Sequence, residues 1–230
     1  MTLPYYQDDA VTLYHGDCRE VMADLPRTCD VLMTDPPYAS AAATVTTGRA
    51  KAKWGGNWGD MSLVAFMVEA TLTGAPLIEG HEVYWFTDHL GYAATVPVMF
   101  RRYPSVQSIV WDKDALGMGA RYRKQTEFIV YAWTQQAPEF ASKSARDLIR
   151  LRPTFDGGKV HSAQKPVELM AELLRPSAGT CVLDPYAGSG TTLLAARQLG
   201  RKAVGVEIEE RYCEIAATRL ASRDLFDGVA

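Results

Sequence analysis

The sequence of 230 residues has few of the features that mark a secreted, metal-binding or membrane-spanning protein. Its four cysteines, Cys18, Cys29, Cys181 and Cys213, form no C-x-x-C pair, and neither they nor the four histidines have metal-ligand spacing. The longest apolar run, residues 63–68, is far too short to span a bilayer, and the amino terminus has no apolar core. We therefore expect a reduced, metal-free protein of the cytoplasm.

The sequence also lacks an excess of positive charge, since its formal net charge is −3 and its isoelectric point is about 5.8. No overall field would draw the protein to nucleic acid, so any such contact must come from local patches. Residues 101–124 and residues 143–165 each carry six cations against two carboxylates. Such strips can neutralise phosphates, although a charged run is more often a solvated face.

Strand and helix patterns alternate along the chain. Apolar or β-branched runs predict seven strands, at 11–16, 30–37, 82–88, 106–112, 126–133, 181–186 and 203–208. Helical periodicity is present at 17–25, 61–72, 166–175, 190–199 and 209–220. The alternation predicts a single α/β domain over residues 1–230, with a seven-stranded, mostly parallel sheet covered by helices on both faces. Residues 106–112 and 126–133 are expected to pair as a hairpin.

Two segments depart from this alternation. Residues 39–60 are small, polar or glycine-rich, and a loop of that length predicts either a mobile functional lid or a disordered segment. Their aromatic and cationic residues suit a lid but are as often packing anchors; they are Trp54, Trp58, Arg49, Lys51 and Lys53. Residues 134–160 are polar and basic without a strong period, which indicates an insertion at the surface.

A glycine-rich turn, DPYAGSG at 184–190, follows a predicted strand and leads directly into a helix. Gly188 and Gly190 allow the backbone to approach a ligand that faces the helix N-terminus. A dinucleotide-binding fingerprint would need glycine where Leu193 stands, and a phosphate loop would need a lysine after the glycines. The sequence therefore disfavours both a dinucleotide site and a phosphate loop. Glu207 ends the next strand, where a carboxylate can accept hydrogen bonds from two ribose hydroxyls. A nucleoside-bearing cofactor explains this combination better than a packing turn does.

A second motif, DPPY, occupies residues 35–38 at the carboxyl end of a predicted strand. Pro36 and Pro37 fix the backbone and lack N–H donors, so nearby carbonyls stay free as acceptors. Asp35 adds a carboxylate, and Tyr38 adds a flat face for stacking. The motif predicts a cup for a planar amine, whereas a proline-rich turn alone would leave the acidic and aromatic residues unexplained.

Four motifs together resemble the DNA amino-methyltransferases that use S-adenosyl-L-methionine: DPPY at 35–38, HSAQKP at 161–166, DPYAGSGTT at 184–192 and GVEI at 205–208. The target-amine motif precedes the cofactor motif, an order similar to the circularly permuted β group of that family. The resemblance implies a Rossmann-like methyltransferase sheet in which strands 181–186 and 203–208 lie beside strand 11–16.

The resemblance also implies roles for individual residues. Asp35 and the Pro36 carbonyl would accept the two amine hydrogens of the target base, within a motif stiffened by Pro37, and Tyr38 would stack on the ring. The cofactor residues would be Asp184, Tyr186, Gly188, Gly190 and Thr191 at the methionine part, Gln164 and Lys165 at its end, Glu207 at the ribose and Asp17 near the adenine. No metal is implied.

The activity implied is methylation of the N6 amine of an adenine flipped out of DNA. Methylation of N4 of cytosine is the close alternative, and methylation of RNA or of a protein amide, or non-catalytic binding of nucleic acid, remain open. Residues 134–160 would then form a short target-recognition region. A homodimer could add DNA-binding surface, and any partner restriction nuclease is left unspecified.

Overall fold

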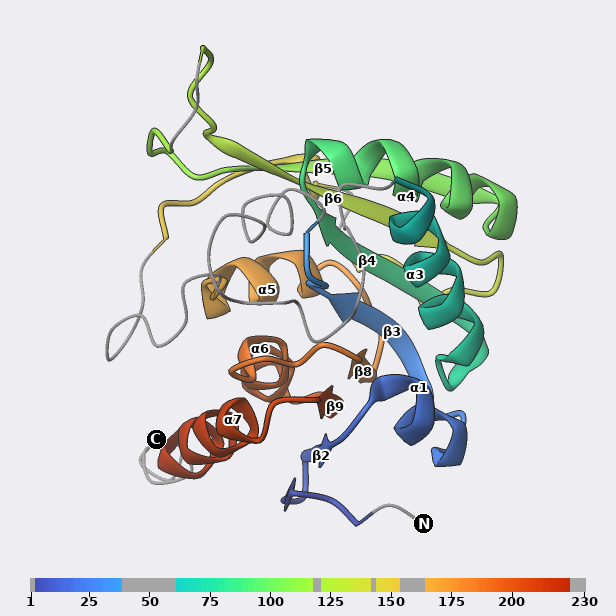
Figure 1. The fold of residues 1–230 in the computed structure, drawn as a ribbon, viewed down its shortest axis with the longest axis vertical. Coiled ribbons are helices and arrows are strands. Elements are labelled where there is room, and N and C mark those ends of the chain that lie inside the picture. Colours follow the sequence, from blue (N-terminus) through green and yellow to red (C-terminus); the bar gives the residue numbers. More distant parts are fainter. Residues whose placement is uncertain (1–2, 39–60, 118–120, 142–143, 154–163, 224–230) are drawn as a thin grey trace.

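The computed structural model describes residues 3–38, 61–117, 121–141, 144–153 and 164–223 (Figure 1). The strands are β1 Tyr6–Gln7, β2 Val11–His15, β3 Cys29–Thr34, β4 Leu77–Thr87, β5 Ser105–Asp112, β6 Thr126–Trp133, β7 Leu148–Arg150, β8 Cys181–Asp184 and β9 Lys202–Glu207. The helices are α1 Cys18–Val21, followed by the 3₁₀ turn η1 Met22–Asp24, then α3 Met61–Gly74, α4 His89–Arg102, α5 Val167–Leu174, α6 Thr191–Gln198 and α7 Glu210–Arg223.

All described strands belong to one sheet with the order β1-β2-β9-β8-β3-β4-β6-β5-β7. Strands β2, β9, β8, β3 and β4 pair in parallel, while β6 runs antiparallel to both β4 and β5. The predicted mostly parallel sheet and the hairpin of β5 and β6 are therefore confirmed. The count of seven strands was wrong, because β1 and β7 are additional edge strands whose two and three residues are too few to show a period.

The two ends of the chain interleave in the sheet. Strands β8 and β9 lie between β2 and β3, with Leu13 opposite Gly205 and Leu32 opposite Leu183. The adjacency implied by the resemblance is confirmed. Residues that are distant in sequence thus end side by side at the carboxyl edge of one sheet.

Helices cover both faces of the sheet, as predicted (Figure 1). Helices α1, α3 and α4 share one hydrophobic cluster with Leu32, and α5, α6 and α7 share another with Val31 and Met33. Successive residues of β3 therefore point into opposite cores, and five of its six residues are buried. This double burial explains why the run from Val31 to Met33 is continuously apolar.

Helix α4 was missed by the sequence analysis, because Pro97 lies within it and lacks the N–H of an ordinary helical residue. The carboxylate of Asp88 caps its first turn by accepting from the backbone N–H groups of Leu90 and Gly91 at 3.1 and 2.8 Å. Burial of Val98 and Met99 against the sheet outweighs the proline. The helix predicted at 17–25 is also shorter than expected, since only one α-helical turn precedes η1.

Some predictions fall outside the described residues. They include the whole of the predicted lid at 39–60 and, within the insertion at 134–160, residues 142–143 and 154–160. None of the described helices is both long and apolar enough to cross a membrane. Across the described ranges, no group of three His, Cys, Asp or Glu residues is placed to hold a metal ion. All four cysteines are free and buried.

Candidate active site

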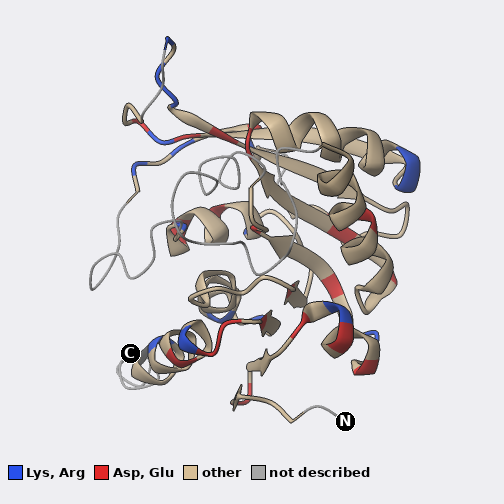
Figure 2. Ribbon diagram, viewed as in Figure 1, with Lys and Arg blue, Asp and Glu red and all other residues tan. Residues whose placement is uncertain are grey.

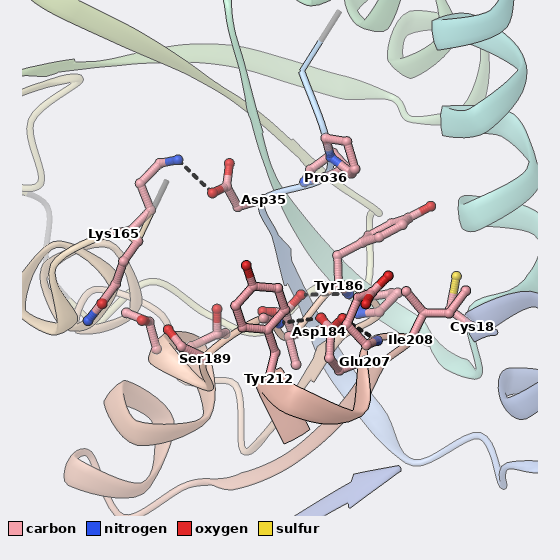
Figure 3. Close-up of a pocket in the computed structure, with 18 of the residues that line it drawn as sticks. Cys18, Asp35, Pro36, Lys165, Asp184, Tyr186, Ser189, Glu207, Ile208 and Tyr212 are labelled. Atoms are coloured by element: carbon pink, nitrogen blue, oxygen red, sulfur yellow. Dashed lines mark hydrogen bonds and ion pairs between the residues drawn. The ribbon is translucent and has the colours of Figure 1, made fainter. Parts of the chain in front are cut away.

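A cavity of about 470 Å³ lies at the carboxyl ends of the central parallel strands (Figure 3). Open parallel sheets bind ligands at this edge, and the volume is typical of a small-molecule site. Both sequence motifs line the cavity. The predicted residues among its walls are Asp35, Pro36, Pro37, Tyr38, Gln164, Lys165, Asp184, Tyr186, Gly188, Thr191 and Glu207.

A buried hydrogen bond joins the two motifs. The Thr34 hydroxyl, at the end of β3, donates to Oδ1 of Asp184, at the end of β8, over 2.8 Å. The same oxygen accepts from the backbone N–H of Tyr186 at 3.1 Å. Burial raises the pKa of Asp184 to about 6, and these hydrogen bonds oppose that rise. The bonds hold the Asp-Pro-Pro-Tyr corner and the glycine turn at a fixed spacing.

The glycine turn adopts backbone conformations that favour glycine, since φ is +52° at Gly188 and +78° at Gly190. Gly188 lines the cavity, and its N–H donates to Oε2 of Glu207 at 2.8 Å. Gly190 is not among the lining residues. A Cβ there would stand 2.9 Å from Cβ of Ala216 in α7, so this glycine permits close packing of α6 on α7.

The Glu207 carboxylate is held by backbone donors on both oxygens. Oε2 accepts from Gly188, and Oε1 accepts from the N–H of Glu209 at 2.8 Å. Glu207 is 8% exposed, and burial raises its pKa while these hydrogen bonds oppose the rise. Each carboxylate oxygen has two lone pairs, so both keep acceptor capacity toward the cavity.

Asp17, like Gly190, is a predicted residue that does not line the cavity. Its side chain caps α1 by accepting from the N–H of Arg19 at 3.0 Å, and it also pairs with the Arg19 guanidinium. The hydrogen bond to Arg19 lowers the pKa of Asp17. Its neighbours Gly16 and Cys18 line the cavity, whereas Asp17 does not.

The target-motif side of the cavity holds a buried ion pair. Nζ of Lys165 lies 2.5 Å from Oδ2 of Asp35, and Figure 3 shows the two side chains pointing at each other. The other oxygen, Oδ1, is buried and has no hydrogen-bond partner among the described residues. Burial raises the pKa of Asp35 against the opposing effect of Lys165. Asp35 thus presents one unsatisfied acceptor, which is costly unless a ligand donates to it.

Lys165 lines the cavity, and its ammonium lies beside Asp35 of the Asp-Pro-Pro-Tyr motif. Nζ lies 4.9 Å from the ring centre of Tyr38 and 3.3 Å from Oε2 of Glu127, on β6. The Tyr38 hydroxyl also donates to Glu127, at 2.9 Å. The sequence analysis missed Glu127, because nothing in its local pattern shows that β6 delivers it to this corner.

Sequence reasoning also missed residues that follow the cofactor motifs closely. Ser189 lies inside the glycine turn, Ile208 follows Glu207, and Tyr212 is in the first turn of α7; all three line the cavity (Figure 3). Their place next to Gly188 and Glu207 was the available signal. Aromatic and apolar side chains beside a carboxylate suit the ring of a nucleoside.

Comparison with known proteins assigns the family. A sequence model of the DNA methylase family of N6-adenine and N4-cytosine methyltransferases matches residues 29–218. The chain belongs to this family, and is a DNA methyltransferase of the amino-methylating class whose methyl donor is S-adenosyl-L-methionine.

Relatives and solved structures agree with this assignment over nearly the whole chain. The chain is 25% identical to the Type II methyltransferase M2.DpnII of Streptococcus pneumoniae, over 97% of this chain and 94% of that one. It is 27% identical to the Type II methyltransferase M.ScaI of Streptomyces caespitosus, over 94% and 83%.

Two solved structures share the fold. M1.HpyAVI, in a complex described as containing S-adenosylmethionine, superposes with a TM-score of 0.67 at 24% identity over 91% of this chain and 99% of that one. The cytosine-N4-specific PvuII DNA methyltransferase superposes with a TM-score of 0.76 at 15% identity over 95% and 89%.

The buried Asp184 carboxyl predicts a pH-dependent contribution to stability. The pKa of Asp184 is about 6 in the folded protein and 3.8 in the unfolded chain. The contribution of this carboxyl to the free energy of unfolding is therefore fully present below pH 3.8 and is lost as the pH rises through 6. Relative to Asp184→Asn, the wild-type free energy of unfolding should fall by about 2 kcal/mol between pH 4 and pH 7. Urea unfolding of both proteins across this range measures the difference. If the difference in unfolding free energy between the two proteins stayed constant with pH, the raised pKa of Asp184 would be contradicted.

Proposed function

We propose that the chain methylates the N6 amine of an adenine that is flipped out of DNA. The observation that carries the proposal is the buried Oδ1 of Asp35, which has no hydrogen-bond partner in the described part of the chain and lies in the same cavity as Gly188 and Glu207. An exocyclic amine offers the hydrogen that this oxygen lacks. Tyr38 lies beside it with a ring suited to stack on the base.

The cavity residues fit S-adenosyl-L-methionine, which when bound supplies an electrophilic methyl group on a sulfonium. Asp184, Glu207 and Glu209 make the cofactor side acidic, which suits a cationic donor. In this proposal Glu207 accepts from the ribose hydroxyls, and the turn with Gly188 and Thr191 surrounds the methionine part, together with Asp184, Tyr186 and Gln164.

The residues of the Asp-Pro-Pro-Tyr motif, 35–38, then orient the amine of the target base. Asp35 and the Pro36 carbonyl accept its two hydrogens, which turns the nitrogen lone pair toward the methyl group. The amine nitrogen would take the methyl group that the bound cofactor supplies, and the cofactor sulfur would keep the electron pair of the broken bond. Nitrogen then gives up one proton, which the Asp35 carboxylate can receive because burial raises its pKa.

Exposed cations offer a surface for the DNA. Figure 2 shows Lys and Arg at the far end of the β5–β6 hairpin, where Arg121, Arg123 and Lys124 are exposed. Cations placed in this way neutralise phosphates without reading sequence. Two relatives of this chain are Type II methyltransferases, which supports a role in restriction-modification.

Cytosine N4 is the second candidate base, because the PvuII enzyme that shares the fold is cytosine-N4-specific. The DPPY motif of this chain favours adenine. Incubation with methyl-labelled cofactor and DNA, followed by digestion to nucleosides, separates the two. We expect the label in N6-methyladenine. Label in N4-methylcytosine would overturn the choice of base, and label confined to RNA or protein would overturn the choice of DNA.

Replacement of Asp35 tests the target corner directly. Asp35→Asn keeps the shape but removes the charge that accepts the amine hydrogens, so we expect the turnover number to fall at least about 1000-fold. Cofactor affinity, measured by calorimetry, should change little. Glu69→Gln, which removes a partly exposed carboxylate of α3 paired with Arg101 and Arg102, is the control and should keep wild-type turnover. Wild-type turnover in Asp35→Asn would remove Asp35 from the mechanism.

A further inference from the structure

Four charged side chains form a chain of ion pairs that begins at Asp35 of the Asp-Pro-Pro-Tyr motif. Lys165 lies between Asp35 and Glu127, at 2.5 and 3.3 Å, and Oε1 of Glu127 pairs with Nζ of Lys113 at 2.6 Å. Two carboxylates thus balance two ammonium groups. Lys165 is 6% exposed and Glu127 is 17% exposed, so these charges interact with little screening by water.

Glu127 contacts both groups that shape the binding corner. Its Oε2 accepts from the Tyr38 hydroxyl at 2.9 Å, which fixes the ring of Tyr38 at its far end. The same oxygen faces the Lys165 ammonium. Burial opposes the charge of Glu127, but Lys165 and Lys113 outweigh burial and lower its pKa, so it remains ionised.

In the ion pair between Asp35 and Lys165, the ammonium competes with a target amine for the Asp35 carboxylate. While Oδ2 of Asp35 holds the ammonium at 2.5 Å, Oδ1 is the carboxylate oxygen that lacks a hydrogen-bond partner among the residues that the structure describes. A buried lysine with a single carboxylate partner would bind that partner more tightly. The second carboxylate, Glu127, gives the ammonium an alternative partner within 3.3 Å.

We propose that Glu127 is a positioning residue for methyl transfer, which holds the Tyr38 ring and shares the Lys165 ammonium so that Asp35 stays available to the target amine. This role rests on the proposed function. Glu127 is absent from the cavity wall and acts through Tyr38 and Lys165.

The first test is Glu127→Gln, which keeps size and an acceptor for Tyr38 but removes the charge. Within the described ranges, Lys165 then keeps Asp35 as its one carboxylate partner, and we expect kcat to fall about 10- to 100-fold with little change in cofactor affinity. The titratable groups around Asp35 in the described structure are Lys165, Glu127, Tyr38 and Asp184. Because the charge of Glu127 raises the pKa of Asp35, its loss should move the acidic limb of the kcat profile to lower pH.

A matched control lies at the other end of the paired strands β4 and β6. Glu82, on β4, is also a buried carboxylate that accepts from a tyrosine, at 2.7 Å from the Tyr131 hydroxyl, but it does not line the cavity. Glu82→Gln should lower stability while leaving kcat and the acidic limb unchanged. An equal loss of kcat in both variants, or an unmoved acidic limb in Glu127→Gln, would reduce Glu127 to a structural residue.

A double-mutant cycle tests whether Glu127 affects methyl transfer through Lys165. In a Lys165→Met background, single-turnover rates should change about 3-fold or less on adding Glu127→Gln, because the two side chains act on each other. A full 10- to 100-fold effect in that background would overturn the role through Lys165.

The outcomes separate the two proposals. Absence of methyl transfer to DNA by the wild-type protein would contradict the proposed function itself. Normal transfer by the wild type, with kcat of Glu127→Gln within about 2-fold of it, would contradict only the role of Glu127.

Discussion

The parallel pairing of β3 with β8 is the constraint on which the site depends. Val31 and Leu32 lie opposite Val182 and Leu183 in the sheet, and the Thr34 hydroxyl continues the connection by donating to Asp184. Both strands therefore end at the same level, one in the Asp-Pro-Pro-Tyr motif and the other in the glycine turn. A one-residue slip would turn alternate side chains to the opposite face and separate the two motifs.

Burial determines how the carboxylates of the cavity titrate and which hydrogen-bond partners they need. Asp184 and Glu207 are 2% and 8% exposed, and burial raises the pKa of each carboxyl; backbone and hydroxyl donors keep both in place. Asp35 instead faces an ammonium group on one oxygen and has no partner on the other among the described residues. The cofactor side is thus structurally satisfied, while the target side keeps one acceptor for its substrate.

Local sequence patterns predicted the elements whose signal is contained in a few consecutive residues. The Asp-Pro-Pro-Tyr motif that follows β3, the turn at Gly188 and the carboxylate at Glu207 each carry such a signal, and the structure brings all three to one cavity. The pairing of Glu127 with Lys165 could not be predicted in this way, because it arises only when the β5–β6 hairpin docks antiparallel on β4. Helix α4 was missed because tertiary burial overrides the local effect of Pro97.

The most direct test of the central claim is a crystal structure with the demethylated cofactor product and a DNA duplex. The account predicts the cofactor against Gly188 and Glu207, with the target amine nitrogen within about 3.2 Å of Oδ1 of Asp35 and facing the cofactor sulfur. A target base held elsewhere, or a cofactor whose sulfur faces away from Asp35, would contradict it.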